Sequence, residues 1–245
     1  MAKNVNLVGI KVFNDDTGTA TTIDIIKALE WVVDQVRSRD SSKAVVNLSL
    51  GGGISPAMDA AIAATVRQGI VVVVAAGNEN GNDPWLFSWS WANEYLGDAD
   101  TTSPAREPLA ITVGAIDVKD KRASFSNYGR KIDIFAPGVD ILSAWIAEPH
   151  QTPTNKEERR ISGTSMGMSM LLLPQMQGTV TNFHSVIASP HVAGVAASIL
   201  SDRNQKGITN AQDVIGEILI NADKRGIENI PRIARFTTIS AIAKL

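Results

Sequence analysis

The feature that most constrains the fold is an alternation of apolar and amphipathic segments over the first third of the chain. Asn6–Phe13, Ala44–Leu48 and Ile70–Ala75 are short and apolar, as expected of strands that are buried on both faces. Between them, residues 22–36 repeat their apolar side chains at helical spacing, and residues 56–68 open with a proline. The order strand, helix, strand, helix, strand predicts an α/β fold with a parallel sheet and helices on both faces.

The rest of the chain continues this pattern. Ile111–Ala115 and Ile132–Phe135 are expected to be further strands, and His191–Leu200 and Ala211–Asn221 to be helices. A chain of 245 residues, 44% of them hydrophobic, is long enough to bury one core. We therefore expect a single domain over residues 1–245, which we also expect to be a monomer.

Three loops are expected to lie where parallel strands end, which is where open α/β sheets bind their ligands. They are Ser49–Gly53, Gly77–Asn80 and the turn at Gly163. Any site of this protein is therefore predicted among these loops.

Composition removes several classes of function. The net charge is -2, with no basic stripe, so nucleic acid is not an expected partner. No cysteine is present, which excludes disulfides and thiolate metal sites. The apolar runs are too short to span a membrane, and residues 1–6 lack the apolar core of a secretory signal.

The strongest motif is in two pieces. Gly163–Met166 reads Gly-Thr-Ser-Met, and Ala188–Gly194 reads Ala-Ser-Pro-His-Val-Ala-Gly. Joined, they resemble the nucleophile motif of the subtilisin-like serine proteases (subtilases, peptidase family S8), in their proteinase K-like branch. The resemblance implies that Ser165 is a nucleophile at the entry of a helix, whose N-terminal N–H groups would face a developing oxyanion.

Two other segments resemble the same family. Ala75-Ala76-Gly77-Asn78 is similar to the segment that carries the oxyanion-hole asparagine, which implies that role for Asn78, with Ala75 and Gly77 beside the substrate. The residues implied as the substrate-binding edge, where extended polypeptide pairs as an added strand, are Ser49, Leu50, Gly51 and Gly52. An isolated serine or asparagine in a glycine-rich turn is more often simple turn chemistry.

Further segments extend the resemblance over most of the chain: Ile111–Ala115, Ser124–Gly129 and Asp133–Gly138. It also implies a structural calcium site built from the carbonyls of Pro108 and Ala110 and the carboxylate of Asp133, because calcium prefers oxygen ligands. The alternative for Asp133 is a solvated loop carboxylate. The chemistry itself is expected to need no cofactor.

The sequence has no segment, in the expected place, that resembles the family's histidine motif, which supplies the base, or its aspartate motif, which orients that base. A serine needs both to become a nucleophile, and neither family motif occurs here. Asp16-Thr17-Gly18 looks like the aspartate motif, but it follows the wrong strand. His191 is expected to pack in a helix, and His150 and His184 lie in no catalytic motif.

From this we expect the Asp and His to lie upstream of Met1 in a longer gene. The chain as written is then predicted to be inactive, and we do not expect it to fold stably on its own. The parent family is mostly extracellular. The alternatives are a non-catalytic protein that binds peptides, or a mispredicted gene product.

Two blocks do not resemble the family. Residues 167–187 split the nucleophile motif, and residues 82–97 follow the Asn78 segment and hold three of the five tryptophans. Each block can be encoded with an intron donor, a branch site and an acceptor, and its removal restores a family-like sequence. We predict that both are unspliced introns. The rival interpretation is that they are true loop insertions.

Overall fold

The computed structural model describes residue 2 and residues 4–14, 17–39, 43–79, 97–144, 158–163, 179–180, 188–202, 208, 210–223 and 227–228. Within them, the main sheet is parallel throughout, in the order β2-β3-β4-β5. Its strands are β2 (Val45–Leu48), β3 (Val71–Ala75), β4 (Ile111–Ile116) and β5 (Ile134–Pro137). These are the strands that the sequence predicted, apart from the N-terminal one.

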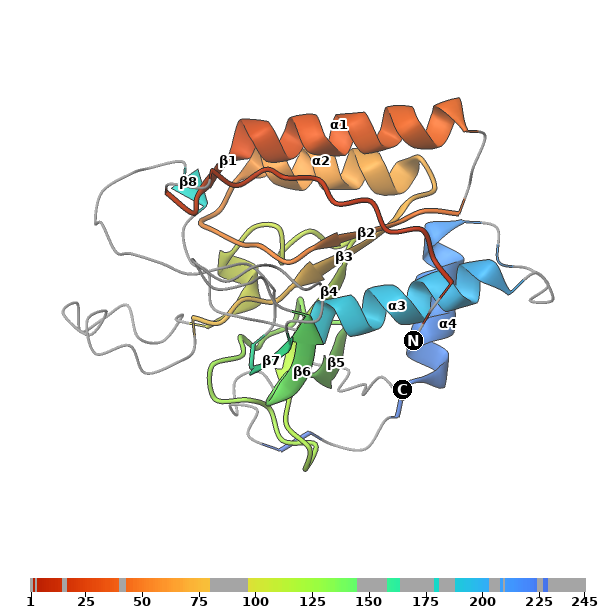
Figure 1. The fold of residues 1–245 in the computed structure, drawn as a ribbon. Helices are drawn as coiled ribbons and strands as arrows, with labels where there is room; N and C mark the ends of the chain where they lie inside the picture. The colour runs from red at the N-terminus through yellow and green to blue at the C-terminus, as the bar shows by residue number, and fades with distance from the viewer. Residues whose placement is uncertain are drawn as a thin grey trace.

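Helices cover both faces of this sheet (Figure 1). On one side, α1 (Thr22–Ser38) packs on α2 (Pro56–Arg67), which contacts β3. On the other, α3 (Ala188–Ser201) contacts all four strands and also α4 (Ala211–Asn221). The predicted α/β architecture is therefore confirmed. No helix among the described residues has the length and apolar character needed to cross a bilayer.

The centre of the core is β3. All five of its residues are buried, because the strand has neighbours on both edges and helices on both faces. Its register aligns Leu48 with Val74 and Ala75 with Val113. The carboxyl ends of β2, β3 and β4 therefore lie close together, and the loops that leave them meet at one edge of the sheet.

Capping side chains fix where the helices begin. The Thr21 hydroxyl accepts a hydrogen bond from the N–H of Asp24 at the start of α1. Asn210 and Asp213 form a reciprocal capping box at the start of α4. Each cap satisfies N–H groups that have no partner within the helix.

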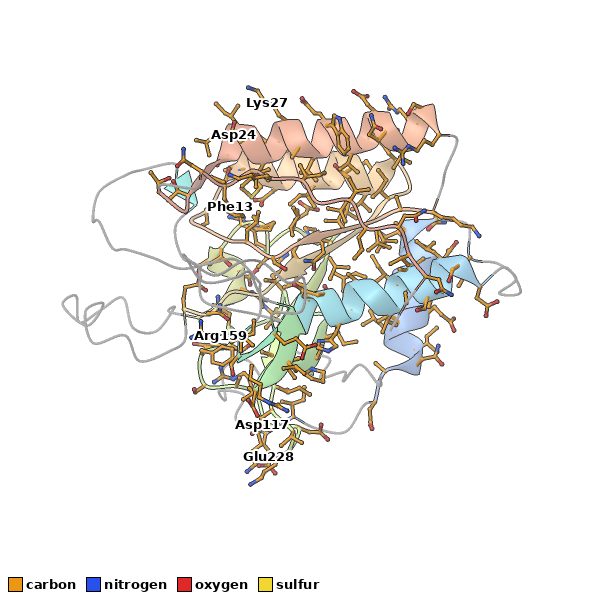
Figure 2. The ribbon with its side chains drawn as sticks, viewed as in Figure 1. Phe13, Asp24, Lys27, Asp117, Arg159 and Glu228 are labelled. Carbon is orange, nitrogen blue, oxygen red and sulfur yellow. The ribbon has the colours of Figure 1, made fainter. Side chains whose placement is uncertain are left out.

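The prediction of a buried strand at Asn6–Phe13 was wrong. Residues 4–14 form no strand, and Leu7 and Val8 are 90% and 60% exposed. A strand needs a neighbour to satisfy its backbone groups, and the described sheet ends at β2. The segment instead runs beside α1, and Figure 2 shows Phe13 of this segment with Asp24 and Lys27 of α1. These three residues are among those that line an open hollow.

Two small antiparallel sheets were not predicted. β6 (Ile141–Ala144) pairs with β7 (Glu158–Ile161), and β1 (Ala20–Thr21) pairs with β8 (Thr179–Val180). β8 belongs to the block 167–187, so part of that block is placed against the body of the protein. β7 ends at Ile161, four residues before Ser165 in the sequence.

Candidate active site

The site lies where β2 and β3 end. Ser49 follows β2 and Ala76 follows β3, and the parallel pairing of the two strands puts both exits side by side. The loops that open there are Ser49–Gly53 and Ala76–Glu79, which we name the Asn78 loop. The structure thus brings together the predicted substrate edge and the predicted oxyanion donor.

Ser49 links the substrate edge to helix α3. The Asn47 amide donates to Ser49 Oγ at 2.6 Å, and Ser49 Oγ lies 3.2 Å from Ser189 Oγ. Ser189 is fully buried in the first turn of α3, and Leu50 is buried beside Ser49. The start of the edge is therefore fixed against the helix that carries the second half of the serine motif.

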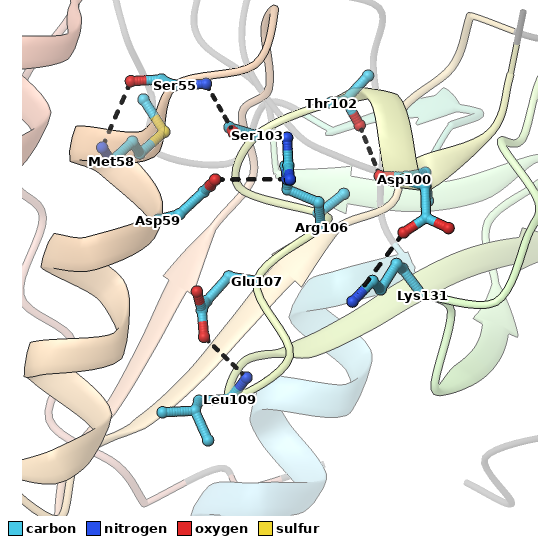
Figure 3. Close-up of polar contacts among 12 residues, drawn as sticks. Ser55, Met58, Asp59, Asp100, Thr102, Ser103, Arg106, Glu107, Leu109 and Lys131 are labelled. Carbon is cyan, nitrogen blue, oxygen red and sulfur yellow. Dashed lines mark hydrogen bonds and ion pairs between the residues drawn. The ribbon is translucent and has the colours of Figure 1, made fainter. Parts of the chain in front are cut away.

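Gly52 is held from the other side by Ser103. Its N–H donates to the Ser103 carbonyl at 2.9 Å, and the Ser103 N–H donates back to Gly52 at 3.1 Å. Ser103 Oγ accepts from the N–H of Ser55, and Arg106 Nε lies 3.6 Å from Asp59 Oδ2 on α2 (Figure 3). Gly52 therefore uses both of its backbone groups inside the protein, so it cannot also pair with an extended substrate as the predicted edge Ser49–Gly52 would require.

The Asn78 loop turns directly after the buried Ala75. Asn78 is half-buried, and the preceding Gly77 has φ +103. The loop is held by Asn127, whose N–H donates to the Gly77 carbonyl and whose Oδ1 accepts from the N–H of Glu79, both at 3.0 Å. Sequence reasoning placed Asn127 in a family-like segment but assigned it no role, because its partners are far away in the chain.

Ser165 lies outside the described residues. The chain is described as far as Gly163, whose N–H donates to the Gly138 carbonyl at 2.6 Å, just after β5. The next described helix, α3, begins at Ala188. The expected entry of Ser165 directly into a helix is therefore not seen in the described residues, and residues 164–187 intervene.

His191 is the only histidine in the described part of the chain. It is 7% exposed on α3, which agrees with the prediction of a packed helical side chain. His150 and His184 lie outside the described residues.

The proposed calcium ligands lie at the opposite end of β4. Asp133 Oδ2 accepts from the N–H of Thr112 at 2.8 Å, while the Asp133 N–H donates to the Thr112 carbonyl. Burial raises the pKa of Asp133 to about 6, against the smaller opposing effects of this N–H and of Lys131. A poorly hydrated carboxylate suits a cation, but no cluster of three His, Cys, Asp or Glu occurs in the described residues. A calcium ion here would need backbone carbonyls, as the sequence suggested for Pro108 and Ala110.

We compared the sequence and the fold of this chain with those of known proteins. A model of the subtilase family matches residues 1–168. Alkaline protease 1 of Aspergillus clavatus is 39% identical over 201 residues, which cover 82% of this chain and 39% of that protein. Subtilisin-like serine protease AsES of Sarocladium strictum is 37% identical over 232 residues, 94% of this chain and 47% of that protein. The chain therefore spans less than half the length of these two relatives.

A solved structure gives the same result. The structure of a cold-adapted subtilisin-like serine proteinase superposes with a TM-score of 0.71 at 33% identity, covering 98% of this chain and 67% of that one. The sequence match and the shared fold agree with the motifs quoted above. This chain belongs to the subtilase family of serine proteases.

Proposed function

We propose that this chain carries the nucleophile and the oxyanion-binding half of a subtilisin-like endopeptidase, which cleaves polypeptides through an acyl-enzyme. Ser165 is the nucleophile, Asn78 is the oxyanion donor and Ser49–Gly51 is the substrate edge. One observation carries the proposal. The Ser49 hydroxyl meets the buried Ser189 on α3, so the substrate edge, the Asn78 loop and the second half of the serine motif converge.

The chemistry follows from this arrangement. Attack of a serine Oγ on a peptide carbonyl places negative charge on the carbonyl oxygen. A side-chain amide aimed at that oxygen stabilises the transition state by about 3 to 4 kcal/mol, a value established on a subtilisin. Extended substrate backbone alongside Ser49–Gly51 would present the carbonyl between Ser165 and Asn78.

Proton transfer is the missing part. A serine hydroxyl loses its proton only to a base that a third group orients. No histidine of this sequence stands in the family's His-Gly-Thr-His context, and His191 is packed in α3. We therefore propose that the chain as written performs no measurable triad-dependent hydrolysis.

Turnover and peptide binding test this proposal together. The purified chain and a Ser165→Ala variant are incubated with a fluorogenic peptide, and binding of a non-cleavable peptide is measured by calorimetry. We expect equal, background turnover from both proteins. Hydrolysis by the unaltered chain that is abolished in Ser165→Ala would contradict the proposal. Peptide binding without hydrolysis would show that the substrate edge is formed, which the proposal and the alternative of a non-catalytic peptide-binding protein both require, and an aggregated product would support a mispredicted gene.

We also propose a structural calcium held by Asp133 with the carbonyls of Pro108 and Ala110. The support is the half-buried Asp133 carboxylate, which is costly to ionise without a cation. Calcium should then raise the melting temperature, because a ligand that binds only the folded state stabilises it. Asp133→Asn should remove the calcium effect, and an equal calcium effect in both proteins would exclude this site.

The two blocks, residues 82–97 and 167–187, are proposed to be retained introns. The support is that α3 begins at Ala188, where the restored motif would continue. The pairing of β8 with β1 favours the rival of a true loop for part of the second block. Sequencing spliced transcripts across both junctions decides, and a mature transcript that keeps both blocks in frame would rule out the intron proposal.

The expected setting follows from the family and the composition. We propose that the parent enzyme works outside the cell as a monomer on polypeptides, without a nucleic-acid partner. A sequence with no cysteine has no disulfide to lose or gain, so its stability does not depend on the redox state of the compartment. Size-exclusion chromatography tests the monomer.

A further inference from the structure

We infer that Asn127 is a positioning residue, which sets the Asn78 loop in the conformation needed to receive an oxyanion. The inference rests on the proposed role of Asn78. Asn127 lies 48 residues beyond Glu79 in the sequence and contacts the Asn78 loop. Asn127 has no exposed surface, so each of its polar atoms must find a partner inside the protein.

Those partners lie on both sides of Asn78. Asn127 Nδ2 donates to the Ala76 carbonyl at 2.9 Å and, in a shorter bond, to the Glu79 carboxylate. Asn127 Oδ1 accepts from the Glu79 N–H, and the Asn127 N–H donates to the Gly77 carbonyl. One side chain and its own backbone N–H therefore bind the residues before and after Asn78, while Asn78 itself is not among these partners.

We call the bonded pair Asn127–Glu79 the clamp. Gly77 shows how closely the Asn78 loop packs against it. A Cβ at position 77 would lie 2.4 Å from Asn127 Nδ2 and 2.2 Å from Glu79 Oε2, closer than any side chain tolerates. Together with φ +103, this approach admits only glycine. The Asn127–Glu79 pair thus lies directly beneath the turn that presents Asn78.

The clamp is itself anchored to the sheet. The Ala115 N–H of β4 donates to Ser126 Oγ at 2.9 Å, and Ser126 Oγ donates to the Asn127 carbonyl at 3.0 Å. The Arg122 guanidinium donates to the carbonyls of Ala123 and Ser126. A continuous set of hydrogen bonds therefore runs from β4 to the Asn78 loop, which gives the loop the rigidity that an oxyanion hole requires.

Hydrogen exchange and peptide affinity test this inference. Asn127→Ala should speed exchange at Gly77–Glu79 by roughly tenfold or more, because the loop loses its fixed partners.

Acetyl-tetra-alanine is then titrated as its free acid and as its C-terminal amide. The chain should prefer the acid, whose carboxylate imitates the oxyanion. Asn127→Ala and Asn78→Ala should each reduce that preference by about tenfold, and the double variant should lose no more than Asn78→Ala alone.

Controls separate positioning from stability. Thr65→Ala removes the hydrogen bond that the buried Thr65 hydroxyl donates to the Ala61 carbonyl within α2, which is not part of the set that runs from β4 to the Asn78 loop, so it should lower stability but keep the acid preference. If Asn127→Ala does not fold, Glu79→Ala removes one arm of the clamp at a half-buried side chain and should speed exchange at the loop to a smaller extent.

The outcomes are distinct. Unchanged loop exchange in a folded Asn127→Ala, or in Glu79→Ala, would overturn the inference. Faster exchange with an intact acid preference would overturn it as well. If the unaltered chain does not distinguish acid from amide, the proposed oxyanion role of Asn78 fails, and loop exchange alone decides whether Asn127 is the clamp.

Discussion

Two polar side chains near the ends of β4 show how burial sets the behaviour of single residues. Asn127 is neutral and every polar atom of its side chain is bonded, so its burial costs little and fixes a loop. Asp133 is an acid that accepts a hydrogen bond from the Thr112 N–H, and its pKa is raised to about 6 mainly by loss of water. Enclosure therefore fixes a loop where the side chain is neutral and fully bonded, and produces a pH-dependent cost where the side chain is an acid.

The first prediction concerns stability against pH in the absence of metal. The folded protein holds a proton on Asp133 up to pH about 6, whereas the unfolded chain releases it near 3.8. Between these values the folded state binds more protons, so this group makes stability fall as pH rises. The contribution should be roughly 2 to 3 kcal/mol in total, complete above about pH 6. Urea unfolding in EDTA at several pH values measures it.

Asp133→Asn is the matched control, since it keeps an oxygen acceptor for the Thr112 N–H without the acid. The difference in unfolding free energy between the two proteins should change across pH 4 to 7 and then level off. A constant difference over that range would show that Asp133 is solvated and has an ordinary pKa.

The separate helices and strands show which sequence signals were sufficient. β3 was predicted because a short, continuous apolar run rich in valine is typical of a strand buried on both faces, and α4 because its apolar residues recur at helical spacing. Asn6–Phe13 failed because an apolar pattern does not tell whether a neighbouring strand is present. The β6–β7 pair was missed because β7 reads Glu-Arg-Arg-Ile, with three exposed residues and no alternation. Likewise the loops Ser49–Gly53 and Gly77–Asn80 were located by their place after β2 and β3, and the roles expected within them came from the family resemblance. The role of Asn127 depends on contacts that no local pattern encodes.

The second prediction concerns the start of α4. Asn210 Oδ1 accepts from the Asp213 N–H at 3.0 Å, and Asp213 Oδ2 accepts from the Asn210 N–H at 3.1 Å. Asn210→Ala should lower the unfolding free energy by about 1 kcal/mol, because the helix loses the partner of an N-terminal N–H. Ser198→Ala in α3 is the control, since the Ser198 hydroxyl donates to the Gly194 carbonyl within the helix and caps no helix end. Equal effects of the two substitutions would mean that the cap contributes nothing special.

At the scale of the whole molecule, the chain on either side of the block 82–97 is held by neighbouring residues of the fold. Glu79, before the block, is bonded to Asn127, and Gly97, at its end, accepts from the Tyr128 N–H at 2.7 Å. Both ends of residues 80–96 are therefore held by two adjacent residues. A segment whose ends already meet can be shortened at little cost in loop closure.

The third prediction is that deletion of residues 82–97 leaves the fold intact. Gly97 has φ +88, and the deletion joins Gly81 to Asp98, so a glycine again occupies that left-handed position. The unfolding free energy should change by less than about 1 kcal/mol. Deletion of residues 167–187, which also removes the pairing of β8 with β1, serves as the comparison. A loss of native circular dichroism after the first deletion would show that the block is an integral part of the fold.

The central claim is that the chain carries a subtilase nucleophile without the groups that activate it. The most direct measurement is intact mass spectrometry after incubation with a fluorophosphonate probe, which phosphonylates only an activated serine, with loss of fluoride. We predict an unmodified mass for the folded chain, the same as for Ser165→Ala. A single adduct that maps to Ser165 and is absent from Ser165→Ala would contradict the claim, because it would show that this chain supplies its own base.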